Sequence, residues 1–133
     1  MRHPKNILII DDDPRMRDLM HRQLRLEGYA ALEAEDGAQA LFLLRAHRKI
    51  DLVLLDILIP FSSGLDIFDS IRKEFPAVPI VVTSVYSKEE QEFLVWDADG
   101  YYYKSESLVV LMQQIRRIFH EKVSVSKGVG NGA

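Results

Sequence analysis

Polar side chains follow four of the five short apolar runs in this sequence. They are Asp11 and Asp12 after residues 7–10, Asp56 after residues 52–55, Thr83 and Ser84 at the end of the run that begins at residue 80, and Lys104 after residues 101–103. A continuous apolar run bounded by turn residues is typical of a strand buried on both faces of a parallel sheet. Packing alone gives no reason for a carboxylate to end such a strand, whereas open α/β sheets bind ligands at the carboxyl ends of their strands. Asp56 is therefore the candidate reactive group.

These residue types together could perform phosphoryl transfer. If the first and third runs are neighbouring strands, about 5 Å apart, three carboxylates crowd one site and resist joint ionisation unless a cation is present. A hard divalent cation with oxygen ligands, Mg²⁺ above all, would relieve that repulsion. The hydroxyl and the ammonium of Lys104 could hold an anion while a carboxylate attacks phosphorus in line. No histidine stands at these strand ends, so acyl transfer fits poorly.

Each polar residue taken alone also has an ordinary structural explanation. Asp13 before Pro14 is typical of a helix N-cap, and either Asp11 or Asp12 could also serve as a cap. Ser84 alone would be a turn former and Lys104 a solvated edge charge. Their joint placement at four strand ends favours a functional site.

Apolar residues at helical spacing follow each apolar run, which predicts five strand–helix units. These segments are Met16–Leu24, Ala38–Leu44, Leu65–Ile71, Phe93–Trp96 and Leu108–Phe119. Strands that alternate with helices predict a parallel sheet with helices on both faces and right-handed crossovers. Residues 29–34 have mixed polarity, which favours an edge strand.

Composition limits the classes of protein that remain. The 133 residues, 47% of them hydrophobic, are enough for one domain. The net charge of −3 does not indicate a nucleic-acid partner, which usually binds a basic surface. The lack of cysteine excludes disulfides and thiolate chemistry. We see no signal peptide and no apolar run of membrane-spanning length, so we expect a cytoplasmic location without membrane contact. We expect one domain over residues 1–122, a disordered small-residue tail over residues 123–133, and no effector after residue 121.

Four motifs in order resemble the receiver domain of two-component response regulators. They are ILIIDDDP, DILIPFSSG, PIVVTS and DGYYYK, and the resemblance covers about residues 6–121. It implies a flavodoxin-like fold, a five-stranded parallel sheet of order 2-1-3-4-5 with helices on both faces. In that order the first, third and fourth strands lie side by side.

The resemblance also implies roles for individual residues. Asp56 would accept a phosphoryl group from a phosphohistidine on a sensor histidine kinase or phosphotransfer protein. Asp12, Asp56 and the backbone carbonyl of Leu58 would bind Mg²⁺, Asp11 would act through water, Lys104 would pair with phosphoryl oxygens, and Tyr101 would be the aromatic switch. Thr83 and Ser84 compete for the role of switch hydroxyl. The family spacing from Pro79 favours Ser84, and strand alternation lets only one of the two face the site.

Phosphorylation would switch a protein-interaction surface. By resemblance this is the face of the fourth helix, fifth strand and fifth helix, which would bind a downstream protein target or a second copy in a homodimer. Val109 and Val110 could belong to that face or be partly buried. Such a protein catalyses its own phosphorylation and slow dephosphorylation but is chiefly a signalling switch.

Several positions depart from the family pattern. Ser105 replaces the proline that usually follows the lysine, and a cis bond before a non-proline residue costs about 3 kcal/mol. Val85 replaces an alanine, and Asp97 stands where glycine is common. Leu58 and Tyr86 are bulky at positions that flank the phosphoryl group, so we expect them to exclude water and prolong the phosphorylated state.

Two other functions compete with the phosphoacceptor hypothesis. A phosphorylation-independent pseudo-receiver would bind partners without chemistry, but it would be expected to have lost Asp56, one of the acidic pair or Lys104. A haloacid-dehalogenase-type phosphatase also begins with an apolar strand and D-x-D, but it needs a second acidic pair after a later strand. None follows Thr83 or Tyr103.

Overall fold

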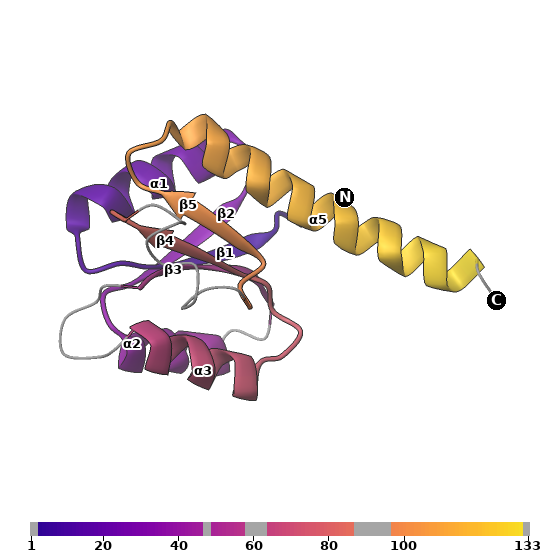
Figure 1. Ribbon diagram of the computed structural model, residues 1–133, viewed down its shortest axis with the longest axis horizontal. Helices are drawn as coiled ribbons and strands as arrows, with labels where there is room; N and C mark the ends of the chain where they lie inside the picture. The colour runs from indigo at the N-terminus through magenta and orange to yellow at the C-terminus, as the bar shows by residue number, and fades with distance from the viewer. Residues whose placement is uncertain (1–2, 47–48, 58–63, 87–96, 132–133) are drawn as a thin grey trace.

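The computed structural model describes residues 3–46, 49–57, 64–86 and 97–131. Within them, the strands of one parallel sheet alternate with helices along the chain (Figure 1). The strands are β1 (Asn6–Ile10), β2 (Ala30–Ala34), β3 (Ile50–Asp56), β4 (Ile80–Ser84) and β5 (Gly100–Tyr103). The helices are α1 (Pro14–Leu26), α2 (Gly37–Ala46), α3 (Gly64–Glu74) and α5 (Leu108–Asn131). The sheet order is β2-β1-β3-β4-β5, which confirms the prediction. The expected helix around Phe93–Trp96 lies outside the described residues.

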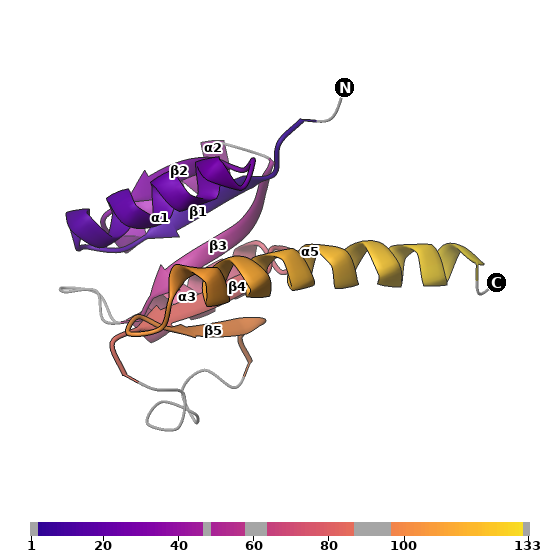
Figure 2. The ribbon, with the colours of Figure 1, turned by 90° about the horizontal axis from the view of Figure 1, so that it is seen from above.

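Helices cover both faces of the sheet, which explains the unbroken apolar runs of the inner strands. Figure 1 shows α2 and α3 on one face and α1 and α5 on the other, and Figure 2 shows α1 and α5 across the top of the sheet. The core on the α2–α3 face includes Leu8, Ile10, Val53, Leu55, Leu44 and Ile71. The core on the α1–α5 face includes Ile7, Ile9, Leu52, Met20, Leu24 and Ile115. Alternate residues of β1 and β3 therefore enter opposite cores.

The edge strands are β2 and β5, as the mixed polarity of residues 29–34 predicted for β2. Only Ala34 of β2 is buried, whereas four of the five residues of β1 are buried. No described helix is long and apolar enough to cross a membrane.

The ends of α1 fix the loop that carries the acidic pair. Asp13 is the N-cap, because its side chain accepts a hydrogen bond from Arg15 N at 3.0 Å, and Pro14 is the first helical residue. Gly28, with φ of +91°, follows the helix in a conformation that side chains rarely adopt. Asp11 and Asp12 are thus held between the end of β1 and a capped helix.

The last helix differs from its sequence-based boundary. Disorder was the expectation after residue 122, but α5 is continuous to Asn131 and its final turns extend past the sheet (Figures 1 and 2). Extending a formed helix is easier than nucleating one, and no proline interrupts residues 123–131. The domain boundary at residue 122 stays a prediction.

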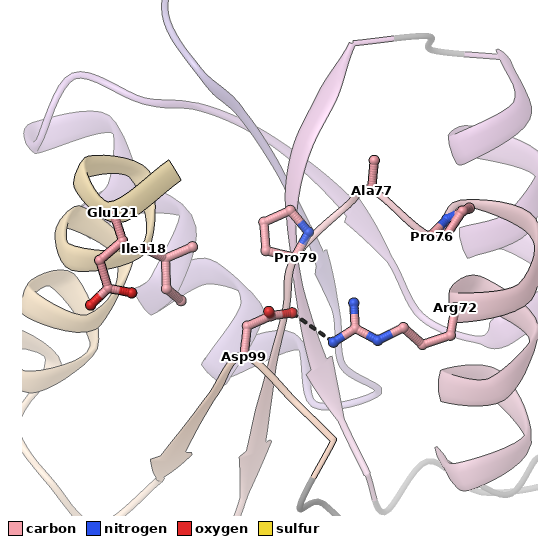
Figure 3. A pocket seen from close by; sticks show the side chains of 7 residues that line it. All are labelled: Arg72, Pro76, Ala77, Pro79, Asp99, Ile118 and Glu121. Atoms are coloured by element: carbon pink, nitrogen blue, oxygen red, sulfur yellow. Dashed lines mark hydrogen bonds and ion pairs between the residues drawn. The ribbon is translucent and has the colours of Figure 1, made fainter. Parts of the chain in front are cut away.

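Arg72 ties α3 to the amino ends of β4 and β5. Its guanidinium donates to Val78 O at 3.1 Å, to Asp97 O at 2.9 Å and to Asp99 Oδ2 at 2.7 Å. Asp99 Oδ2 also accepts from Ile80 N at 2.8 Å, so one carboxylate joins the helix to the first residue of β4. A cleft of about 310 Å³ lies beside this ion pair, between α3 and α5 (Figure 3). The cleft is at the sheet edge opposite the carboxyl ends of the strands.

Replacing Arg72 should weaken the fold. We expect Arg72→Met to lower the free energy of unfolding by about 2 kcal/mol, because it leaves Asp99 and two carbonyl oxygens without their charged donor. Lys73→Met is the matched control, since Lys73 is the exposed next residue of α3. Denaturant unfolding measures both variants, and equal midpoints for the two would contradict this role of Arg72.

Candidate functional site

The carboxyl ends of β1 and β3 bring three carboxylates together. The two strands are neighbours, and Ile10 pairs with Leu55, so Asp11 and Asp56 end the two strands side by side. Asp11 is 1% exposed and Asp56 is 4% exposed, while Asp12 is exposed. One carboxylate oxygen from each residue lies within 4.8 Å of the others. The structure thus assembles the predicted acidic cluster.

Lys104 reaches this cluster from the end of β5. Its Nζ donates a hydrogen bond to Asp56 Oδ2 at 3.1 Å. It also lies 2.8 Å from Asp11 Oδ2, and this second contact is an ion pair whose angles do not fit a hydrogen bond. The Lys104 side chain is only 9% exposed. Among the described residues, Lys104 therefore pairs with two of the three clustered carboxylates, Asp11 and Asp56.

Burial and charge shift the ionisation of both partners. Burial raises the pKa of the Asp11 carboxyl, although Lys104 and the Asp13 N–H, 2.9 Å from Asp11 Oδ1, act in the opposite direction. Burial lowers the pKa of Lys104, but the neighbouring Asp11 and Asp56 outweigh it, and the net effect raises that pKa above its ordinary value. The lysine is therefore charged at neutral pH, whereas burial favours the neutral form of the Asp11 carboxyl.

The donor set fits a hard divalent cation. Carboxylate oxygens from Asp11, Asp12 and Asp56 are ligands of the kind that Mg²⁺ and Ca²⁺ prefer, and their spacing allows all three to face one ion. Exposed Asp12 leaves a side of the cluster open to water, which suits Mg²⁺ because that ion keeps several waters. Leu58, whose carbonyl was expected as a ligand, lies outside the described residues.

The two candidate hydroxyls lie at the end of β4, and both residues are buried. Thr83 pairs with Asp56 in the β3–β4 register, so its side chain projects on the same face of the sheet as Asp56, and Ser84 projects on the other. Ser84 Oγ accepts a hydrogen bond from Tyr86 N at 3.0 Å. Ser84 as the switch hydroxyl stays a prediction. The strand register adds a reason to consider Thr83 for the same role, because Thr83 lies on the same face of the sheet as Asp56.

Tyr101 is partly buried and contacts the loop after β4. Its hydroxyl donates to Tyr86 O at 2.7 Å. The backbone of Tyr86 therefore makes two hydrogen bonds: its N–H donates to Ser84 Oγ, and its carbonyl oxygen accepts from the Tyr101 hydroxyl. Sequence reasoning considered the Tyr86 side chain and missed its main chain, which no residue type reveals.

Two further residues shape the site. Arg17 NH1 donates to Asp11 O at 2.6 Å and its Nε pairs with Glu33 at 3.2 Å, which fixes the acidic loop against β2. A Cβ at Gly64 would lie 2.0 Å from Ile57 O, so only glycine allows α3 to begin against the end of β3. The glycine of the DILIPFSSG motif has this physical reason, whereas Arg17 gave no signal in the sequence.

Other departures from the family pattern are also placed. No peptide bond among the described residues is cis, so the Lys104–Ser105 bond is trans. Val85 is 55% exposed and Tyr86 is 45% exposed, in the loop that follows β4. Val109 is 56% exposed, and Val110 is partly buried.

Comparison with known sequences identifies the family. The model of the response regulator receiver domain matches residues 7–116. The probable transcriptional regulatory protein TcrX of Mycobacterium tuberculosis is 30% identical over 117 residues, which are 86% of this chain and 50% of that protein. Response regulator MprA of Mycolicibacterium vanbaalenii is 30% identical over 132 residues, which are 98% of this chain and 56% of that protein. The chain belongs to the response regulator receiver family and spans about half the length of these relatives.

Solved structures give the same result. Response regulator TrrA of Thermotoga maritima, crystallised with Mg²⁺-BeF, is 35% identical with a TM-score of 0.77, over 85% of this chain and 97% of that one. TrrA has also been solved in complex with the histidine kinase ThkA. A receiver domain protein of Methanospirillum hungatei is 25% identical with a TM-score of 0.84, over 92% of this chain and 98% of that one.

Removing one carboxylate should weaken cation binding. We expect Asp12→Asn to weaken Mg²⁺ affinity by about tenfold or more, because the site loses a charged oxygen ligand. Asp13→Asn is the matched control, since asparagine caps a helix as well as aspartate does. The shift of the unfolding midpoint with added Mg²⁺ measures both, and equal shifts in the two variants would argue against a metal at the acidic cluster.

Proposed function

We propose that Asp56 accepts a phosphoryl group from a phosphohistidine of a sensor histidine kinase or phosphotransfer protein, in a reaction that needs Mg²⁺. The observation that carries this proposal is the buried Asp56 carboxylate, which lies with two other carboxylates and receives the Lys104 ammonium at 3.1 Å. The complex of the similar protein TrrA with a histidine kinase supports this class of partner.

The proposed reaction is an in-line displacement at phosphorus. A carboxylate oxygen of Asp56 forms a bond to phosphorus while the bond from phosphorus to the imidazole nitrogen breaks, and the imidazole leaves with the electron pair. Asp11, Asp12, Asp56 and the carbonyl of Leu58 would hold Mg²⁺, which supplies positive charge for the phosphoryl oxygens when bound. Lys104 would exchange part of its pairing with Asp56 for a contact with those oxygens.

The switch would begin at the Ser84 hydroxyl at the end of β4. If Ser84 Oγ turns to a phosphoryl oxygen, it changes its hydrogen bond with Tyr86 N, and the Tyr86 backbone also holds the Tyr101 ring. Tyr101 would then bias the surface of the fourth helix, β5 and α5 toward a state that binds a downstream protein or a second copy. Exposed Val109 on α5 supplies apolar area for that surface.

A pseudo-receiver that binds partners without phosphorylation is the alternative. It has no need for Asp56, Lys104 and the acidic pair to converge, so the assembled cluster favours the phosphoacceptor. The domain would act in the cytoplasm, and its net charge of −3 favours protein partners over direct contact with nucleic acid.

Chemical phosphorylation tests the proposal directly. Acetyl phosphate with Mg²⁺ should add one phosphoryl group to the wild-type chain, as measured by intact mass, and Asp56→Asn should remain unmodified. Asp69→Asn, an exposed carboxylate of α3, is the control and should be modified like the wild type. Modification that persists in Asp56→Asn would overturn the assignment of the acceptor.

The lifetime of the phosphorylated state tests the role of the bulky flanking residues. Replacing Leu58 and Tyr86 together by asparagine should shorten that lifetime by about tenfold, which corresponds to about 1.4 kcal/mol of activation free energy, because water gains access to phosphorus. Phe42→Asn, at an exposed aromatic residue on α2, is the control. Phosphate release measures all three proteins, and a lifetime equal to that of the wild type would refute water exclusion.

A further inference from the structure

On the outer side of β5, the backbone of Tyr101 is hydrogen-bonded to a side chain of α5 where a further strand would otherwise pair. β5 is an edge strand with β4 on one side, so alternate backbone groups point away from the sheet. At Tyr101 both groups bond to Gln114 of α5. Gln114 Oε1 accepts from Tyr101 N at 3.1 Å, and Gln114 Nε2 donates to Tyr101 O at 2.8 Å. The amide thus occupies the place of a neighbouring strand residue.

The surroundings of this contact are built to admit the amide. A Cβ at Gly100 would lie 2.7 Å from Gln114 Oε1, so the glycine before Tyr101 leaves the space that the side chain fills. Leu111, Ile115 and Ile118 of α5 are buried, whereas Gln114 is a partly buried polar residue among them. A partly buried polar residue is tolerated at such a position when its side-chain oxygen and nitrogen are both hydrogen-bonded, as those of Gln114 are.

Gln114 also ends a series of hydrogen bonds that starts at Ser84, the last residue of β4. Ser84 Oγ bonds to Tyr86 N, Tyr86 O accepts from the Tyr101 hydroxyl, and the Tyr101 backbone bonds to Gln114. The series therefore connects the end of β4 to the second turn of α5 through the residue expected to be the aromatic switch.

We propose that Gln114 is a positioning residue that clamps the Tyr101 backbone to α5. With the backbone clamped, movement of the Tyr101 ring is passed to α5 and is not absorbed by movement of the edge strand. The part of this inference that concerns signalling rests on the proposed function, because it needs Tyr101 to respond to phosphorylated Asp56. The clamp itself does not depend on phosphorylation.

Amide hydrogen exchange on the unphosphorylated protein tests the clamp. Gln114→Met keeps the length and helix propensity of the side chain but removes both bonds, so the Tyr101 amide should exchange about tenfold faster. Gln113→Met, at the exposed adjacent residue, should leave that exchange unchanged. Gly100→Ala should also speed it, because the new Cβ displaces the amide. Equal exchange of the Tyr101 amide in wild type, Gln114→Met and Gly100→Ala would overturn the clamp.

Phosphorylation of the same proteins tests the passage of the signal. Each is treated with acetyl phosphate and Mg²⁺, and its modification is checked by mass before amide shifts of α5 are compared. The wild type and Gln113→Met should show phosphorylation-dependent shifts over residues 111–118, and Gln114→Met should lose most of them. Shifts that persist in phosphorylated Gln114→Met would refute the positioning role. Absence of phosphorylation in the wild type would instead refute the proposed function, while the exchange result would still decide the clamp.

Discussion

The gathering of three carboxylates at the carboxyl ends of the strands is the constraint on which the rest of this structure depends. Three carboxylates meet there, two of them buried, and within the described part of the chain Lys104 pairs with the two buried ones, Asp11 and Asp56. Such a cluster is costly in a folded protein unless a cation or a phosphoryl group with its metal completes the balance of charge. Sheet order, the capped start of α1 and the close approach at Gly64 all hold the carboxylates in place despite their repulsion.

The amino ends and the carboxyl ends of the strands differ in the kind of contact that they make. At the amino ends of β4 and β5, the Arg72–Asp99 pair is fully engaged and fastens α3 to the sheet. At the carboxyl ends, the bonds of Ser84, Tyr86 and Tyr101 involve single hydroxyls that could exchange partners. The amino ends are thus joined by one ion pair with several bonds, whereas the carboxyl ends are joined by single hydrogen bonds, which a two-state switch would need to exchange.

The sequence predicted the sheet, its order and the convergence of Asp11, Asp12, Asp56 and Lys104, because these follow from strand periodicity and from the position of each residue after an apolar run. It did not predict contacts that depend on three-dimensional register. The pairing of Thr83 with Asp56, the hold of Arg17 on Asp11 O and the clamp of Gln114 on Tyr101 join residues whose types are ordinary where they stand. The structure continues α5 to Asn131, because a helix that is already formed extends at little cost, and the domain boundary and the disordered tail stay predictions.

A crystal structure with Mg²⁺ and beryllofluoride, a mimic of the phosphoryl group, tests the central claim most directly. The account predicts one metal ion in contact with or bridged by water to Asp11, Asp12 and Asp56, the mimic bonded to an Asp56 oxygen, and Lys104 Nζ against a fluorine. A mimic bound to another carboxylate, or a metal ion away from these three residues, would contradict it.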